Sequence, residues 1–129
     1  MGAATLLPFP AFSNFAKRSN FTEIRRGVGM YTERGETIGW LMNDNALVAV
    51  DSQYPQTAAN YIAGIKDKTS RKMDYLINSH HHGDHTGGNS NMASEGATIV
   101  AHGNVRTNLM NAIETSPNRI HETVLPKIT

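Results

Sequence analysis

The chain has 129 residues, enough for one domain with a buried core. Its 12 lysines and arginines nearly balance its 11 aspartates and glutamates, and a formal net charge of +1 provides no field to recruit nucleic acid or an anionic membrane surface. The absence of cysteine excludes disulfides, thiolate metal ligands and a thiol nucleophile. It also means that cysteine usage gives no indication of an oxidising or a reducing compartment. No apolar run approaches the roughly 18 residues of a membrane span. Together with the small net charge, this leads us to expect neither nucleic acid nor a membrane as a partner.

The N-terminal part of the chain predicts an irregular arm followed by a β-meander. Residues 1–20 contain two prolines and scattered aromatics and predict the arm. From Phe21 the apolar residues alternate with a period of about two, and turn residues interrupt them at Gly35 and at 43–45. The stretch 21–51 therefore predicts three or four short antiparallel strands.

The rest of the chain alternates between helical and strand patterns. The predicted elements, in chain order, are a helix at 55–68, a strand at 73–79, a short helix at 89–96, a strand at 97–102 and a helix at 104–114. The strand at 73–79 has an unbroken apolar centre, which is typical of burial on both faces. This order predicts an α/β fold with a mixed sheet and helices on one face, while the tail from Pro117 has no strong period.

Residues 79–88 read SHHHGDHTGG and concentrate four of the six histidines of the chain directly after a predicted strand. If the chain leaves that strand still extended, His80 and His82 point to one side and His81 to the other. Two imidazoles on one side can share a metal ion. A purification tag would lie at a terminus, so we interpret this internal run as a metal site.

The second part of the run adds an oxygen and a nitrogen ligand. Gly83 lets the backbone turn sharply, which would bring Asp84 and His85 to a second position nearby. The spacing predicts a two-metal site, with ions about 3.5–4 Å apart that share a bridging hydroxide. Imidazole and carboxylate without thiolate suit zinc, and also iron or manganese. We expect that Gly87 and Gly88, which have no side chains, let the backbone of the following turn pass close to the metals.

Other candidate residues have simpler interpretations. His102 follows a predicted strand and His121 lies in the aperiodic tail, and we expect neither to bind the metals. Tyr31 and Trp40 lie on predicted strands, where aromatic side chains are usual in the core, so we expect core positions for both in place of a substrate pocket.

The run SHHHGDHTGG resembles the HxHxDH signature of the metallo-β-lactamase fold superfamily, whose members usually have threonine where this chain has Ser79. Upstream, ALVAVDS resembles the first motif of the family, a strand that ends at an aspartate, here Asp51. The later ATIVAH resembles the strand that follows the signature in many members. The resemblance covers approximately residues 21–129. It implies that Asp51, with Ser79, supports the metal loop by orienting its ligands.

The resemblance also implies a ligand set and an architecture. His80 and His82 would bind the first of two zinc ions, and Asp84 and His85 the second, with Asp84 also the catalytic group that orients the attacking hydroxide. The implied architecture is the first αβ half of an αββα sandwich. Family members take further ligands from a C-terminal half, and this chain stops before those motifs would be expected, so we expect a truncation.

The implied function is a dinuclear metal-dependent hydrolase whose bridging hydroxide attacks a carbonyl or ester of a small-molecule substrate, such as a β-lactam, lactone or thioester. Iron-dependent redox enzymes share this signature and remain an alternative, as does a non-catalytic half-domain. Because both faces of the predicted sheet are apolar and helices cover one, we expect self-association or pairing with a C-terminal half. The substrate itself is not indicated, since the fold does not fix it.

Overall fold

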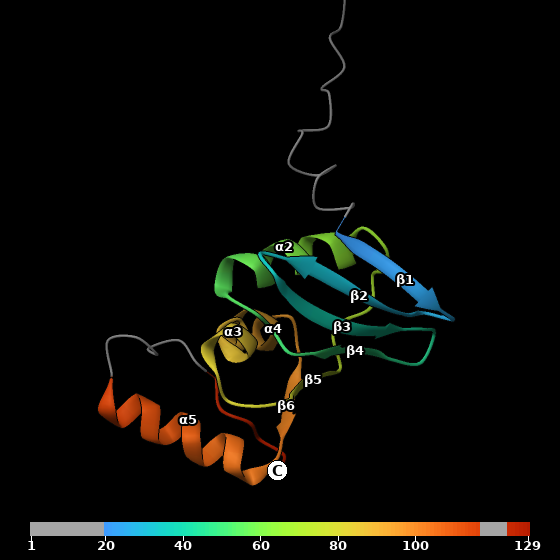
Figure 1. The fold of residues 1–129 in the computed structure, drawn as a ribbon. Coiled ribbons are helices and arrows are strands. Elements are labelled where there is room, and N and C mark those ends of the chain that lie inside the picture. The colour runs from blue at the N-terminus through green and yellow to red at the C-terminus, as the bar shows by residue number, and fades with distance from the viewer. Residues whose placement is uncertain (1–19, 117–123) are drawn as a thin grey trace, which may run out of the picture.

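The computed structural model describes residues 20–116 and 124–129, and it shows one mixed six-stranded sheet with helices (Figure 1). The strands are β1 (Phe21–Arg25), β2 (Val28–Glu33), β3 (Glu36–Met42), β4 (Leu47–Val50), β5 (Tyr75–Asn78) and β6 (Thr98–Ala101). They lie in chain order across the sheet. The first four pair antiparallel, as the alternating pattern predicted, whereas β4, β5 and β6 are parallel neighbours.

Two-residue turns connect the first strands. In both Arg26–Gly27 and Arg34–Gly35 the two turn residues have positive φ, the conformation that matches the twist of a tight hairpin. The next turn is held by the side chain of Asn43, whose Oδ1 accepts hydrogen bonds from the backbone N–H groups of Asn45 and Ala46. The predicted breaks at Gly35 and at 43–45 are therefore confirmed.

The described helices are α2 (Pro55–Lys66), α3 (Gly83–Thr86), α4 (Asn89–Ser94) and α5 (Gly103–Thr115). Pro55 occupies the first turn of α2, where its missing N–H costs nothing. Helix α2 makes the crossover between the parallel strands β4 and β5, and α3 and α4 make the one between β5 and β6. The sequence predicted α2, α4 and α5, but not the short helix α3.

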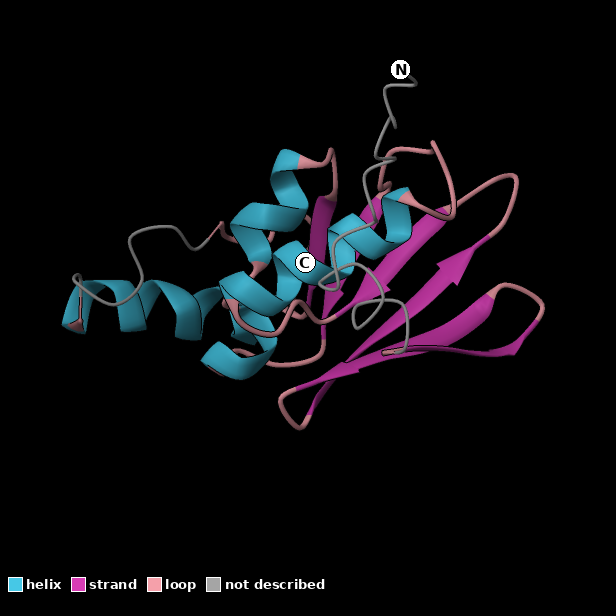
Figure 2. Cartoon of the chain, turned by 90° about the horizontal axis from the view of Figure 1, so that it is seen from above, coloured by secondary structure: helices cyan, strands magenta, loops and turns pink. Residues whose placement is uncertain are grey.

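The core lies between one face of the sheet and helices α2 and α4. Figure 2 shows the helices gathered on one side of the twisted strands. The residues buried there include Tyr31, Ile38, Trp40, Leu47, Leu76 and Ile99 from the sheet, with Tyr61, Ile62 and Ile65 from α2 and Met92 from α4. Tyr31 and Trp40 are thus core residues, as predicted. Helix α5 packs elsewhere, in a small cluster with Ala101 at the end of β6.

The opposite face of the sheet is exposed in this chain. Strand β5 alternates between exposed and buried residues, so Tyr75 and Ile77 point away from the helices while Leu76 is buried. The prediction that this strand is buried on both faces is therefore wrong for the chain by itself, because its unbroken apolar run has a cover on one side only.

Two stretches lie outside the described residues. Residues 1–19 include nearly all of the predicted N-terminal arm, and residues 117–123 include His121. Among the described residues, no helix combines the length and the apolar character needed to cross a membrane.

Candidate metal centre

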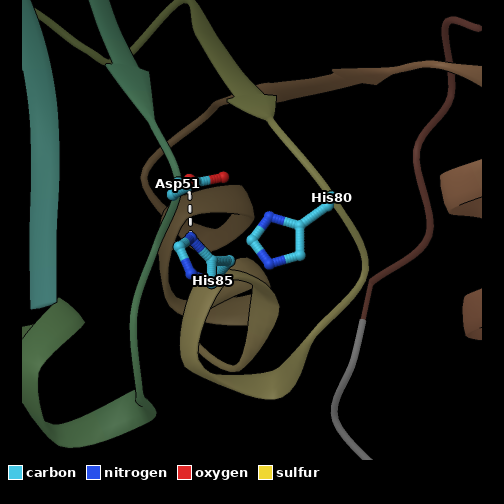
Figure 3. Close-up of side chains that lie close together, drawn as sticks. All are labelled: Asp51, His80 and His85. Carbon is cyan, nitrogen blue, oxygen red and sulfur yellow. Dashed lines mark hydrogen bonds and ion pairs between the residues drawn. The ribbon is translucent and has the colours of Figure 1, made fainter.

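The candidate site forms where two parallel strands end. Because β4 and β5 are parallel neighbours, Asp51 after β4 and Ser79 after β5 emerge at the same edge of the sheet, the edge at which open α/β sheets bind ligands. A backbone hydrogen bond of 2.8 Å from Asp51 N to Ile77 O fixes the two segments together. Figure 3 shows that the side chains of Asp51, His80 and His85 point toward one another at this edge.

Both carboxylate oxygens of Asp51 accept hydrogen bonds from the histidine-rich run. Its Oδ1 accepts a hydrogen bond from Ser79 N at 2.8 Å, and its Oδ2 accepts one from Ser79 Oγ at 2.6 Å. The same Oδ2 lies 2.8 Å from His85 Nδ1. Asp51 is buried and has a φ of 63°, a left-handed conformation uncommon outside glycine. Both oxygens are thus already engaged, which favours a supporting role over direct metal binding, although Asp51, His80 and His85 offer atoms close enough to share an ion.

These hydrogen bonds set the tautomers of two histidines. A carboxylate only accepts, so His85 Nδ1 carries the hydrogen and, in the neutral ring, leaves Nε2 unprotonated. Ser79 Oγ gives its single hydrogen to Asp51, so at 3.0 Å it accepts one from His80 Nδ1, which leaves His80 Nε2 unprotonated as well. Asp51 therefore directs two imidazole lone pairs, one through Ser79, in the way that outer carboxylates orient metal-binding histidines.

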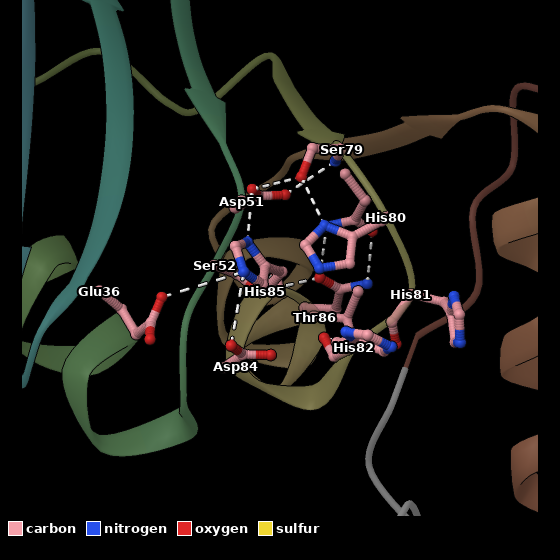
Figure 4. Close-up of polar contacts among 12 residues, drawn as sticks. Glu36, Asp51, Ser52, Ser79, His80, His81, His82, Asp84, His85 and Thr86 are labelled. Atoms are coloured by element: carbon pink, nitrogen blue, oxygen red, sulfur yellow. Dashed lines mark hydrogen bonds and ion pairs between the residues drawn. The ribbon is translucent and has the colours of Figure 1, made fainter.

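Two further groups of side chains converge beside these histidines. His80, His82 and Asp84 form one group and Glu36, Asp84 and His85 the other, and within each group the nitrogen and oxygen atoms lie within 4.8 Å of one another. The groups share Asp84, so they describe adjacent positions around one carboxylate (Figure 4). The four side chains assigned to two metal ions from the sequence therefore lie close together, and which of them share an ion stays a prediction.

His81 belongs to none of these groups, although its ring lies edge-on to that of His82 with 4.7 Å between the centroids. Its Nδ1 lies 3.4 Å from Asn108 Nδ2 on α5. His102 caps α5, and its Nδ1 accepts a hydrogen bond from Asn104 N at 3.2 Å, which is the loop role expected for it.

The glycines of the loop act differently from the prediction. Gly83 begins α3 in place of a sharp turn, and a Cβ built there would meet nothing within 4 Å. A Cβ on Gly88 would lie 2.4 Å from Ser52 O and 2.4 Å from Ala58 Cβ, and one on Gly87 would lie 2.7 Å from Gly83 O. The turn at Gly87 and Gly88 thus packs tightly against α2 and the segment after β4.

A network of buried polar side chains stabilises the backbone of the histidine-rich run. Asn78 and Asn89 exchange hydrogen bonds of 3.0 and 2.8 Å through their side-chain amides, and Ser52 Oγ donates to Asn89 Oδ1 at 2.9 Å. Ser52 N also donates to His85 O at 2.8 Å. This network joins the ends of β4 and β5 to α3 and α4, which fixes the backbone that carries the histidines.

The sequence model of the metallo-beta-lactamase superfamily matches residues 43–125, which include all of these side chains except Glu36. The chain belongs to the metallo-β-lactamase superfamily. A comparison with curated proteins found no match.

Solved structures show the same fold. A metallo-β-lactamase with a HARLDQ motif from Cronobacter sakazakii (Enterobacter sakazakii) aligns with a TM-score of 0.72 at 17% identity, over 84% of this chain and 45% of its own. The metallo-β-lactamase SMB-1 bound to 2-mercaptoethanesulfonate aligns at 0.65 and 21%, over 85% and 44%. MEM-A1, a subclass B3 metallo-β-lactamase from a soil metagenome library, aligns at 0.64 and 22%, over 70% and 35%.

These alignments fix the architecture. The chain spans less than half the length of each of the three solved relatives, in agreement with the first αβ half of the metallo-β-lactamase fold. The mixed sheet with helices on one face, predicted from the order of elements, is confirmed.

The side chains of this superfamily member fit a zinc ion in their chemistry and spacing. Two ligands about 2.0–2.1 Å from one tetrahedral ion lie about 3.4 Å apart. His85 Nε2 and Asp84 Oδ2 are 3.5 Å apart. Imidazole nitrogens whose other nitrogen is hydrogen-bonded, together with a carboxylate, are the usual donors of catalytic zinc sites.

Proposed function

We propose that this chain carries the metal-binding half of a dinuclear zinc-dependent hydrolase that acts on a carbonyl or ester group of a small molecule. The observation that supports this proposal is the convergence of His80, His82, Asp84 and His85 at the carboxyl edge of the sheet, in the fold of the metallo-β-lactamase superfamily. Carboxylate and imidazole ligands that are only partly buried leave room for a substrate beside them.

Each side chain has a proposed task. His80 and His82 would bind the first zinc ion, and Asp84 and His85 the second. When bound, the two ions would lower the pKa of a shared water toward neutrality and polarise the oxygen of the scissile bond. Asp84 belongs to both groups of side chains, which supports a role in which its carboxylate would accept a hydrogen bond from the attacking water and orient it. Asp51 and Ser79 keep the imidazoles in the metal-binding tautomer.

The substrate class proposed first is the β-lactams, because the similar solved structures are named as metallo-β-lactamases. Lactones and thioesters have the same electrophilic carbonyl and are tested beside them. Iron in place of zinc would favour the redox alternative, so the metal content of protein purified without added metal discriminates between the two.

The experiment measures zinc content and hydrolysis together, in the chain and in the native gene product if its intact mass is larger. We expect hydrolysis to stop on chelation and to return with zinc. Asp84→Ala should reduce the rate on the order of 10²-fold or more, because it removes a shared ligand and the group that orients water. Asp44→Ala, in the turn before β4 at the opposite edge of the sheet, is the matched control. Hydrolysis that survives exhaustive chelation would contradict the proposal.

A further inference from the structure

A carboxylate from outside the histidine-rich run lies on the solvent side of His85. Glu36 is the first residue of β3, directly after the hairpin turn Arg34–Gly35, and its Oε2 lies 3.9 Å from His85 Nε2 (Figure 4). On the other side of the ring, His85 Nδ1 is hydrogen-bonded to Asp51, whose side chain is only 10% exposed. The side chains of Glu36 and Asp84 are 30% and 34% exposed. A molecule from solvent therefore approaches His85 past these two carboxylates.

The register of the sheet places Glu36 at this edge. Strand β3 runs antiparallel to β4 with Gly39 opposite Val50, so the start of β3 projects past the end of β4. Alternation along β3 directs Glu36 to the same face as the buried Ile38, which is the face that carries the helices. Glu36 therefore points away from the face on which the second half of an αββα sandwich would pack.

Glu36 faces a second glutamate across the hairpin, and the two carboxylates differ in their contacts. The Glu33 carboxylate accepts hydrogen bonds from Asn60 Nδ2 at 3.0 and 3.1 Å and another from the hydroxyl of Tyr31. Among the described residues, the Glu36 carboxylate has no hydrogen bond and no ion pair with a lysine or arginine. The charge of Glu33 is thus used within the fold, whereas the charge of Glu36 acts on whatever binds beside His85.

We propose that Glu36 selects substrates that carry a positively charged amine near the scissile carbonyl and disfavours those with an anionic group there. An ammonium group on the solvent side of His85 would be attracted by the Glu36 carboxylate, and a carboxylate or sulfonate would be repelled. The inference rests on the proposed function and narrows its substrates to the amine-bearing members of each class. It requires no bond between Glu36 and a metal ion, so it is independent of the ligands that complete either metal position.

Three thiols of similar length test this inference, because they differ in the charge of their terminal group. Cysteamine ends in an ammonium, 2-mercaptoethanol in a hydroxyl and 2-mercaptoethanesulfonate in a sulfonate, and each can bind a metal ion through its thiolate. Each thiol is titrated into the cobalt(II)-loaded 129-residue chain, and into the native gene product if its intact mass is larger. The thiolate-to-cobalt absorption gives the dissociation constants, and comparison between variants cancels the different acidities of the thiols.

The measured quantity is the dissociation constant of the sulfonate divided by that of cysteamine. Glu36→Gln keeps the size of the side chain and removes its charge, so we expect this ratio to fall at least about tenfold. In the parent protein the ratio should also fall as salt is added, because a partly exposed charge is screened. The constant for the uncharged 2-mercaptoethanol should change by no more than about twofold in Glu36→Gln. Glu36→Asp retains the charge and should restore most of the preference.

Glu33→Gln is the matched control. It removes the same charge from the facing position of the hairpin, where the amide oxygen can still accept a hydrogen bond from Asn60. We expect a ratio within about twofold of the parent value, because that carboxylate does not line the approach to His85. An equal fall in Glu33→Gln would show a general field of the hairpin and overturn the role of Glu36.

The remaining outcomes separate the inference from the proposed function. An unchanged ratio in a folded, cobalt-loaded Glu36→Gln would overturn the inference alone, as would a loaded parent protein that binds none of the three thiols. A parent protein that binds no metal ion would overturn the proposed function and this inference together. Circular dichroism confirms folding, and if Glu36→Gln fails to fold, Glu36→Ala decides.

Discussion

Asp51 is the residue on which the geometry of the candidate metal centre depends most. It combines burial, a left-handed backbone and hydrogen bonds to Ser79 and His85, and it lies outside the histidine-rich run. A strained backbone conformation persists where the surrounding structure stabilises it. For Asp51, the contacts come from the ends of β4 and β5 and from α3. The scaffold itself thus orients two candidate ligands, His85 directly and His80 through Ser79.

The hydroxyl of Ser79 should tune metal affinity without touching the metal. Ser79→Ala removes the acceptor of His80 Nδ1–H, and we expect a loss of about tenfold in zinc affinity at the first position. Ser79→Thr keeps the hydroxyl and should bind zinc as the parent chain does. Competition with a chromophoric chelator measures both, and a Ser79→Ala chain with unchanged affinity would contradict the tautomer argument.

Sequence reasoning reached the candidate ligands in the run but not the residues that come to them through sheet pairing. His80, His82, Asp84 and His85 are close in sequence, so their spacing alone predicts a shared site. Glu36 enters through the register of β3 on β4, which no local pattern specifies. The same holds for the network of Ser52, Asn78 and Asn89, because polar residues in a sequence do not show which of them will be buried together.

At the scale of elements, the turn between α3 and α4 has no room for a side chain. Gly88→Ala places a methyl group 2.4 Å from both Ser52 O and Ala58 Cβ, and we expect a loss of about 1–3 kcal/mol in stability from overpacking. Gly83→Ala, where a Cβ meets nothing within 4 Å, is the matched control and should be close to neutral. Chemical denaturation measures both, and equal stabilities would refute the close packing.

The start of β4 is fastened to the start of β5 by Asp74. Its Oδ2 accepts hydrogen bonds from Leu47 N at 2.8 Å and from Arg71 Nε at 3.1 Å. The Leu47 N–H and then the Arg71 guanidinium hold the pKa of Asp74 below its usual range. The ionised carboxylate therefore stabilises the fold above its ordinary pKa of about 3.9, and that stability is lost as pH falls through the lower folded value.

Asp74→Asn tests this linkage. We expect the variant to be less stable than the parent chain at neutral pH. The difference should shrink as pH falls below about 4, because the carboxylate is protonated there first in the unfolded chain and, at lower pH, in the folded chain as well. Urea denaturation between pH 2 and pH 7 measures the difference. A gap between the two chains that stays constant down to pH 2 would contradict the assigned role of Asp74.

Periodicity predicted most elements because it reflects burial directly. The meander, α2 and α5 all followed from spacing that one covered face imposes. Helix α3 was missed because its four residues are too few to show a period. Strand β5 was predicted to be buried on both faces because its apolar run is unbroken. Such a run does not indicate which part of a protein packs on the second face.

At the scale of the whole molecule, the face of the sheet opposite the helices exposes several apolar side chains. Val50 on β4 pairs with Ile77 on β5, and Val48 with Tyr75, all on the face opposite the helices. Val50, Tyr75 and Ile77 are 40–45% exposed, and Val28 and Met30 continue the exposed face on β2. Several large apolar side chains exposed on one face mark an interface. We propose that the isolated chain covers it with a second copy of itself, in the absence of a C-terminal half.

This proposal predicts a dimer of the 129-residue chain in light scattering. A symmetric pair would bring the same face of both copies together, so each substitution acts twice. Val50→Ser combined with Ile77→Ser should shift the equilibrium toward monomer at micromolar concentration, because two apolar side chains per copy lose their burial. Met110→Ser changes an equally exposed residue on α5, away from the sheet, and should leave the dimer intact. A parent chain that stays monomeric at high concentration would show that this face tolerates water, and a dimer broken equally by Met110→Ser would place the interface on α5.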